Sequence, residues 1–244
     1  MGIITCSRDL INASRQNTGS NLFLIDGVLY KVFCDTSFQA EKERNIEYLI
    51  SRRPVKPYVL DKIVGTNELI GYTQEFIPLA KTFKDGIDSP DYDKKFKAIL
   101  DVFKSIKKIH DGGFIIGDVH AKNFIYNDDG GYLIDLDEMR DPKTDDWKFR
   151  DYYLVKNHEN SSPIRAENKY TDIVKATIAS LSMLLRFDLE ESVKDESLDS
   201  IKPYIDWLIS DSSVKNQLFD MFDCPDQIVY LDDIIEGKEK ILIK

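Results

Sequence analysis

The sequence lacks the features that mark several large classes of protein. Its three cysteines, Cys6, Cys34 and Cys224, are widely separated and form no metal-binding or disulfide spacing. Its formal net charge of -10 at pH 7 argues against broad binding to a nucleic-acid backbone, because such binding needs a basic surface. It also lacks a recognisable signal peptide and any apolar run of membrane-spanning length. We therefore expect a cytoplasmic protein that binds neither nucleic acid nor membrane.

The most informative stretch of the sequence is residues 110–137, HDGGFIIGDVHAKNFIYNDDGGYLIDLD, in which carboxylate and amide residues in short turns alternate with apolar runs. The runs FIYN and GYLI around an NDDGG turn predict a β-hairpin. A hairpin brings its two ends together, so Asn123 before it and Asp135 after it should lie side by side. Amide and carboxylate oxygens are ligands that Mg²⁺ accepts. Asp118, just upstream, would remain nearby to accept a proton.

Asp and Asn more often cap turns than bind metals. For any one of these residues, turn capping is the simpler interpretation. Three such residues at this spacing, with apolar strands between them, instead favour a site for a divalent cation.

The N-terminal part predicts a small antiparallel sheet with one helix. Strands at 22–25 and 28–33 flank an Asp-Gly turn, and two further strands are expected within 55–76. Between them, FQAEKERNIEYLISRR at 38–53 predicts a helix with Thr36-Ser37 as its N-cap.

Lys31 lies inside the second of these strands, where an exposed position is the ordinary alternative. If Lys31 instead points inward, a glutamate of the following helix should pair with it. We favour Glu43, because Ile46 and Leu49 follow it at core-facing intervals, and keep Glu47 as the second choice.

A connector follows residue 77, and the chain beyond about residue 90 is rich in helix apart from the central hairpin. Apolar spacing predicts a helix over 94–113, and a strongly apolar helix is expected over 172–187 with Thr171 as its cap. Residues 138–170 show no clear period, which is typical of a long functional loop. Two or three shorter helices should complete the chain. We predict an N-terminal lobe of residues 1–77 and a C-terminal lobe of residues 78–244.

Taken in order, these features resemble the protein kinase-like superfamily. VLYK resembles the strand motif whose lysine holds nucleotide phosphates, and YTQEFIPL resembles the hinge that meets adenine. GDVHAKN resembles the catalytic loop, IDLD resembles the DFG element, and Asp172 matches an aspartate that braces the catalytic loop. The resemblance covers nearly the whole chain.

The resemblance implies an α+β, bilobal protein kinase-like fold, with a small antiparallel-sheet N-terminal lobe carrying one helix and a mainly helical C-terminal lobe. It implies a phosphotransferase that uses ATP and Mg²⁺. The implied site residues are Asp118, Lys31, Glu43 and His120 for catalysis, Gly19, Ser20, Lys31, Gln74, Glu75 and Ile77 for ATP, and Asn123 and Asp135 for the metal.

The chain also departs from the protein kinase pattern. Ile116-Gly117 stands where His-Arg usually precedes the catalytic aspartate, Asp137 replaces the DFG glycine, and the phosphate loop NTGSN holds only Gly19. His120 matches a histidine in the catalytic loop of aminoglycoside and choline kinase relatives.

The sequence therefore leaves two candidate classes of phosphoryl acceptor. We favour Ser and Thr hydroxyls of protein, because SSPIRAEN would lie where protein kinases position a peptide. The alternative is a small-molecule kinase, whose cationic substrate the acidic chain would suit. A nucleotide-binding pseudokinase is a third reading, permitted by the poor phosphate loop but disfavoured by the complete Lys, Asp, Asn and Asp set.

Overall fold

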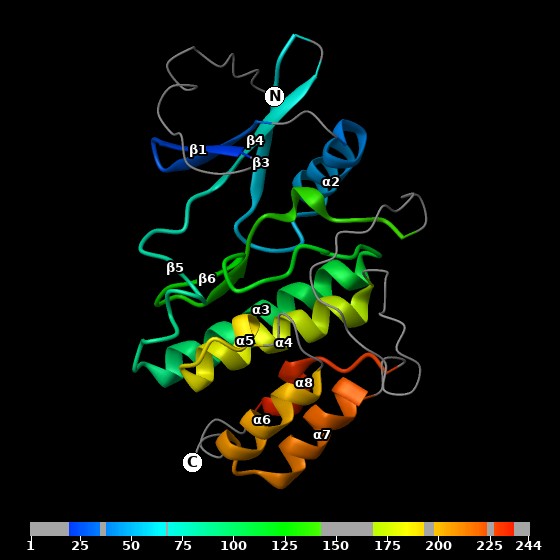
Figure 1. Ribbon diagram of the computed structural model, residues 1–244. Helices are drawn as coiled ribbons and strands as arrows, with labels where there is room; N and C mark the ends of the chain where they lie inside the picture. The colour runs from blue at the N-terminus through cyan, green and yellow to red at the C-terminus, as the bar shows by residue number, and fades with distance from the viewer. Residues whose placement is uncertain are drawn as a thin grey trace.

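The computed structural model describes residues 20–34, 38–66, 68–142, 168–192, 198–223 and 227–236. The chain folds into two parts, with a β-sheet and one helix above and a helical assembly below (Figure 1). The predicted lobe boundary after residue 77 falls between β4, the last strand of the upper sheet, and β5, the first strand of the lower part.

The upper part is a four-stranded antiparallel sheet in the order β1-β2-β4-β3. Its strands are β1 (Ser20–Ile25), β2 (Val28–Phe33), β3 (Val59–Val64) and β4 (Leu69–Glu75). Asp26 and Gly27 join β1 to β2 with φ values of 50° and 78°, as the tight hairpin turn requires. The predicted sheet is therefore present, and it places Lys31 directly opposite Tyr72 of β4.

Helix α2 (Gln39–Arg52) packs against this sheet. It begins after Phe38, whereas Thr36-Ser37, the predicted cap, lies outside the described residues. Its buried face holds two polar residues beside the apolar ones, namely Lys42 and Asn45 with Ile46 and Leu49. The helix therefore offers a cation and an amide, rather than a carboxylate, to the interior.

A second antiparallel sheet, β5-β6-β7, opens the lower part. It is built from β5 (Lys81–Thr82), β6 (Phe124–Tyr126) and β7 (Gly131–Leu133), followed by the 3₁₀ turn η1 (Leu136–Glu138). The pairing of β6 with β7 confirms the predicted hairpin. Gly131 lets it rest on the helix below, because a Cβ there would overlap the Ala98 carbonyl oxygen.

The rest of the lower part is helical. Its elements are α3 (Tyr92–Asp111), α4 (Lys169–Leu185), α5 (Leu189–Ser192), η2 (Leu198–Ile201), α6 (Lys202–Leu208), α7 (Ser212–Asp223) and α8 (Leu231–Ile235). Helix α4 is buried on all sides from Tyr170 to Leu184, as its apolar sequence predicts. No helix in the described ranges is long and apolar enough to cross a membrane.

Helix α4 begins three residues before its predicted start. Asn168, not Thr171, is the N-cap, and the two form a capping box in which each side chain bonds the other's backbone N–H. Of the long loop predicted at 138–170, residues 143–167 lie outside the described part of the chain.

Candidate active site

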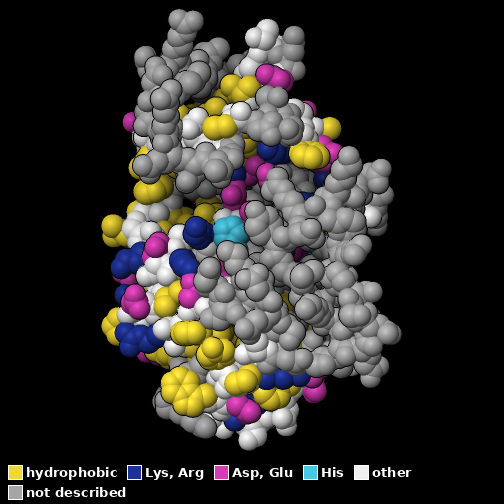
Figure 2. Space-filling model, viewed as in Figure 1, with side chains coloured by type: hydrophobic (Ala, Val, Ile, Leu, Met, Phe, Trp, Pro, Cys, Tyr) yellow, Lys and Arg dark blue, Asp and Glu magenta, His cyan; other side chains and the backbone are white. Residues whose placement is uncertain are grey.

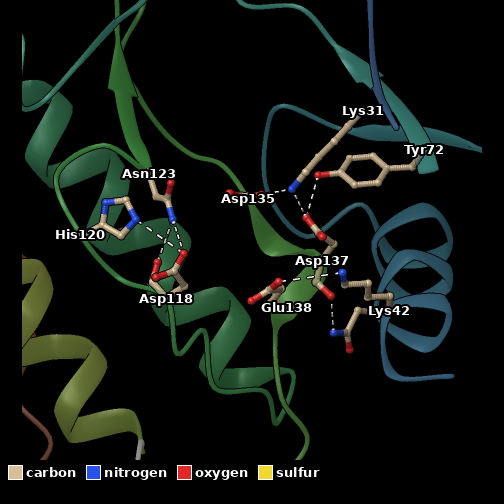
Figure 3. Close-up of polar contacts among 10 residues, drawn as sticks. Lys31, Lys42, Tyr72, Asp118, His120, Asn123, Asp135, Asp137 and Glu138 are labelled. Carbon is tan, nitrogen blue, oxygen red and sulfur yellow. Dashed lines mark hydrogen bonds and ion pairs between the residues drawn. The ribbon is translucent and has the colours of Figure 1, made fainter. Parts of the chain in front are cut away.

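The loop between α3 and β6 brings three predicted site residues together. Asn123 is buried and donates from Nδ2 to the Asp118 carbonyl oxygen at 2.9 Å and to Asp118 Oδ2 at 3.1 Å. The same Oδ2 lies 3.5 Å from His120 Nε2. Figure 3 shows the three side chains converging in one group. Asp118 is thus held in place, and its side chain remains 44% exposed, within reach of a substrate.

The charges of Asp118 and His120 stabilise each other. The hydrogen bond from His120 lowers the pKa of the Asp118 carboxyl, against the opposing effect of burial. Burial lowers the pKa of His120, but the hydrogen bond and charge of Asp118 outweigh it and raise that pKa above its ordinary value. Asp118 is therefore ionised at neutral pH, as a residue that accepts a hydroxyl proton must be.

The hairpin places Asn123 next to Asp135, as predicted. The Ile134 N–H donates to the Asn123 carbonyl oxygen at 3.0 Å, so the residue after Ile134 lies beside Asn123. Asp135 has a φ of 66°, a left-handed conformation that Asp tolerates better than most residues. Its side chain is 40% exposed and contacts the Lys31 ammonium group of the upper sheet. Carboxylates are visible on the surface between the upper and lower parts (Figure 2).

These residues fit a hard divalent cation, because an amide oxygen and a partly exposed carboxylate are the donors that Mg²⁺ takes. The described residues contain no group of three His, Cys, Asp or Glu side chains that could hold a metal by themselves. A cation here would therefore depend on Asn123 and Asp135, with its remaining ligands coming from substrate and water.

Lys31 reaches the same region from the upper sheet. Its ammonium group contacts Asp135 Oδ1 and lies 2.5 Å from Asp137 Oδ1. Burial lowers the pKa of Lys31, but the neighbouring Tyr72, Asp137 and Asp135 raise it well above its ordinary value. Lys31 is thus a fixed positive charge in the space between the two parts.

The predicted pairing of Lys31 with Glu43 is not formed. Glu43 and its alternative Glu47 both contact Lys62 of β3, at 2.9 Å and 2.5 Å. The reason is helical geometry: Glu43 follows buried Lys42 by one residue, and each residue turns the helix by about 100°. The Glu43 side chain is therefore exposed, at the edge of the helix that lies beside Lys62 of β3.

Asp172 braces the catalytic loop, as the resemblance implies. This fully buried carboxylate accepts hydrogen bonds from the backbone N–H groups of Ile116 at 2.7 Å and Gly117 at 2.9 Å, and lies 2.9 Å from His110 Nε2. Lys175, one turn further along α4, donates to the Gly117 carbonyl oxygen at 3.1 Å. Gly117 has a φ of 79°, a left-handed conformation that suits glycine.

The hinge residues line a hollow of about 380 Å³, a size typical of small-molecule sites. Glu75 and Ile77 border it together with Val28 and Tyr132. Gln74 is buried in β4 and does not line it. The Glu75 backbone N–H bonds the Tyr58 carbonyl oxygen at 3.0 Å, so this group already has a partner within the upper part.

The predicted phosphate loop is only partly described. Gly19 lies outside the described residues, and Ser20 begins β1 opposite Phe33. Sequence reasoning missed Glu190, which accepts a hydrogen bond from the Ala121 N–H at 2.8 Å and so supports the catalytic loop from α5. Nothing in its local sequence marks it, because the contact spans 69 residues.

The chain is similar to known proteins in sequence and in fold. The model of the family described as lipopolysaccharide core biosynthesis protein (WaaY) matches residues 59–181, half of the chain. The match includes Asp118, Asn123, Asp135 and Asp172 and leaves out Lys31. No curated protein sequence matches the chain.

Among solved structures, the kinase PK-1 of Cydia pomonella granulovirus is similar, with 14% sequence identity and a TM-score of 0.59 over 87% of this chain and 85% of that one. This likeness confirms the predicted kinase-like fold. The family match and the fold together show that the chain belongs to the lipopolysaccharide core biosynthesis protein (WaaY) family, a kinase-like family.

Proposed function

We propose that the protein is an ATP- and Mg²⁺-dependent phosphotransferase that phosphorylates a hydroxyl group of a saccharide. The observation that carries the proposal is the convergence of Asp118, Asn123 and Asp135 at one hairpin, with Lys31 reaching the same place from the other part. A base, a metal site and a phosphate-binding cation are the parts that phosphoryl transfer requires.

In the proposed reaction, Asp118 orients the acceptor hydroxyl and takes its proton. The acceptor oxygen bonds to the γ-phosphorus of ATP as the bond from that phosphorus to the bridging oxygen breaks, and ADP leaves. Lys31 holds phosphate oxygens. A bound Mg²⁺, held by Asn123 and Asp135, would neutralise charge on the phosphates. His120, beside Asp118, is placed to balance negative charge on the transferred group.

The saccharide acceptor is inferred from the family and from the catalytic loop. The family description names lipopolysaccharide core biosynthesis, and a polysaccharide core offers hydroxyl acceptors. His120 contacts the proposed base, and it is the residue that the sequence shares with small-molecule kinases. The adenine of ATP is assigned to the hollow beside Glu75 and Ile77.

Transfer to protein Ser or Thr hydroxyls is the second candidate. It is favoured by the brace that Asp172 forms with the catalytic loop, the feature on which the protein-kinase resemblance partly rests. The segment SSPIRAEN, expected to meet a peptide, lies almost entirely outside the described residues.

Asp135→Ala should abolish Mg·ATP-dependent phosphoryl transfer without unfolding the protein. Its side chain is partly exposed, so its removal costs little packing, while the metal loses one of two protein ligands. Turnover is measured with labelled ATP, and folding by circular dichroism. Asp61→Asn, an exposed position on β3, is the control. Undiminished turnover in folded Asp135→Ala would contradict the assignment.

Mass spectrometry after incubation with Mg·ATP separates the candidate functions. Phosphate added to a core oligosaccharide supports the saccharide acceptor, whereas phosphate added to the protein itself or to a peptide library supports the protein acceptor. Added nucleotide would indicate nucleotidyl transfer instead. Nucleotide binding with no transfer to any acceptor would identify a pseudokinase and overturn the proposal.

A further inference from the structure

Lys31 has two carboxylate partners that differ in their surroundings. The Asp135 side chain is 40% exposed, whereas that of Asp137 is 2% exposed. Lys31 itself is 11% exposed. A buried ammonium group needs a counter-charge, because leaving it unpaired is costly. Asp137 supplies that counter-charge from within the protein, while Asp135 stands at the edge where substrate and metal would enter.

Asp137 is fixed by contacts that do not involve Lys31. The Tyr72 hydroxyl donates to Asp137 Oδ1 at 3.1 Å, and Asn45 donates from Nδ2 to the Asp137 carbonyl oxygen at 2.9 Å. Asn45 also donates to the carbonyl oxygen of Met139. Figure 3 shows Lys31 and Tyr72 meeting at the Asp137 carboxylate, apart from the group around Asp118.

Helix α2 contributes a lysine and an amide to this arrangement, whereas a glutamate was expected. It presents Lys42 and Asn45 to the turn at 136–139, and Lys42 Nζ lies 3.9 Å from Glu138 Oε1. The acidic side of the contact therefore belongs to the turn and the basic side to the helix. Glu43, facing Lys62, takes no part.

We propose that Asp137, held by Tyr72, is the positioning residue for Lys31 and takes the role expected of Glu43. If Asp135 is occupied by a cation, Lys31 keeps Asp137 as a buried partner and stays directed at the phosphates. The inference deepens the proposed phosphotransfer and rests on it for the role of Lys31. The pairing of Lys31 with Asp137 can be tested without turnover.

The test compares the reactivity of Lys31 toward a lysine-directed acylating reagent, at one fixed pH and without nucleotide, by peptide mass spectrometry. Asp137→Asn keeps the shape of the side chain and removes its charge. It should raise acylation of Lys31 about fivefold, because the lysine loses its buried ion-pair partner. Glu43→Gln and the control Asp61→Asn should leave Lys31 acylation unchanged.

A second variant keeps the test decisive if Asp137→Asn does not fold. Tyr72→Phe removes the hydroxyl that holds Asp137 and should raise Lys31 acylation about twofold, a smaller effect because the carboxylate remains. A rise with Glu43→Gln, or no rise in folded Asp137→Asn or Tyr72→Phe, would overturn the inference.

Kinetics then connect the pairing to phosphoryl transfer. Asp137→Asn should raise the KM for ATP more than it lowers kcat, because Lys31 binds phosphate in both ground and transition states. If the wild-type protein turns over ATP but Asp137→Asn leaves Lys31 acylation unchanged, the role of Asp137 is refuted and the proposed phosphotransferase activity stands. No wild-type turnover would refute the proposed function, and the acylation result would then decide the pairing alone.

Discussion

The direction of a single side chain decides which residues reach the buried lysine. Glu43 and Ile46 are three residues apart, which suggested a shared face. The buried residues of α2 are Lys42, Asn45, Ile46 and Leu49, and Glu43 lies beyond the edge of that face. A shift of one residue turns a helical side chain by about 100°. That shift sends Glu43 to Lys62 and leaves Lys31 to carboxylates more than 100 residues away in the sequence.

At the same scale, the contact between His120 and Asp118 should be visible in the titration of His120. Asp118→Asn should lower the pKa of His120 from its raised value toward or below the ordinary 6.5, since the variant loses the charge that offsets burial. Proton NMR of the imidazole measures this, with the signal assigned by its absence in His120→Gln. Asp61→Asn should leave the value unchanged, and an unchanged value in Asp118→Asn would refute the pairing.

The same pair links stability to pH. The folded-state pKa of His120 is raised. Protonated His120 therefore contributes to the stability of the fold fully below its unfolded pKa of 6.5, and this contribution is lost as pH rises through the folded pKa. The pKa of Asp118 is lowered, so its contribution is present above its unfolded value of 3.8 and is lost as pH falls through the folded pKa. The charged pair therefore stabilises the fold most between these two values.

At the scale of elements, α4 acts as the support for the catalytic loop. Its buried Asp172 satisfies two backbone N–H groups of the loop and contacts a buried histidine of α3. A local sequence pattern places this helix well but not its cap, because Asn168 and Thr171 are both good capping residues. Their reciprocal hydrogen bonds require the helix to start at the earlier residue.

Asp172→Ala should lower the free energy of unfolding by about 3 to 5 kcal/mol, because it leaves the N–H groups of Ile116 and Gly117 buried without partners. Urea denaturation measures the change. Asp220→Ala, at an exposed position on α7, is the matched control and should change stability by less than about 0.5 kcal/mol. A loss from Asp172→Ala as small as that of the control would show that the loop does not depend on this brace.

At the scale of the whole molecule, the proposed site exists only where the two parts meet. Lys31 comes from the upper sheet, and Asp118, Asn123 and Asp135 come from the lower part. A ligand that binds both should stabilise the folded chain as a unit, since it has no comparable site in the unfolded chain.

Mg·ATP at about 100 times its Kd should therefore stabilise the protein by about 2.7 kcal/mol. This corresponds to a rise in Tm of about 5 to 10 °C for a chain of this size. Differential scanning fluorimetry measures the shift. ATP with EDTA, or Mg·ATP with Asp135→Ala, should give a smaller shift. Equal shifts in all three samples would show that no metal bound through Asp135 contributes to binding.

The local features of this protein follow from its amino-acid sequence alone. The upper sheet, helix α3 and the central hairpin follow from turn residues and apolar periodicity, which act between near neighbours. Asn123 and Asp135 could be placed together for the same reason. The paired strands of a β-hairpin hold the residues at its two ends close to each other.

The pairing of side chains across the site depends instead on how the folded chain packs. Asp137, Tyr72 and Asn45 form one network around Lys31, although they come from η1, β4 and α2. Local periodicity says which residues face inward but not which of them meet, because that depends on how the two parts pack. The closeness of Asn123 and Asp135 was thus predictable from a hairpin, while the position of Lys31 depends on contacts that only the folded chain brings together.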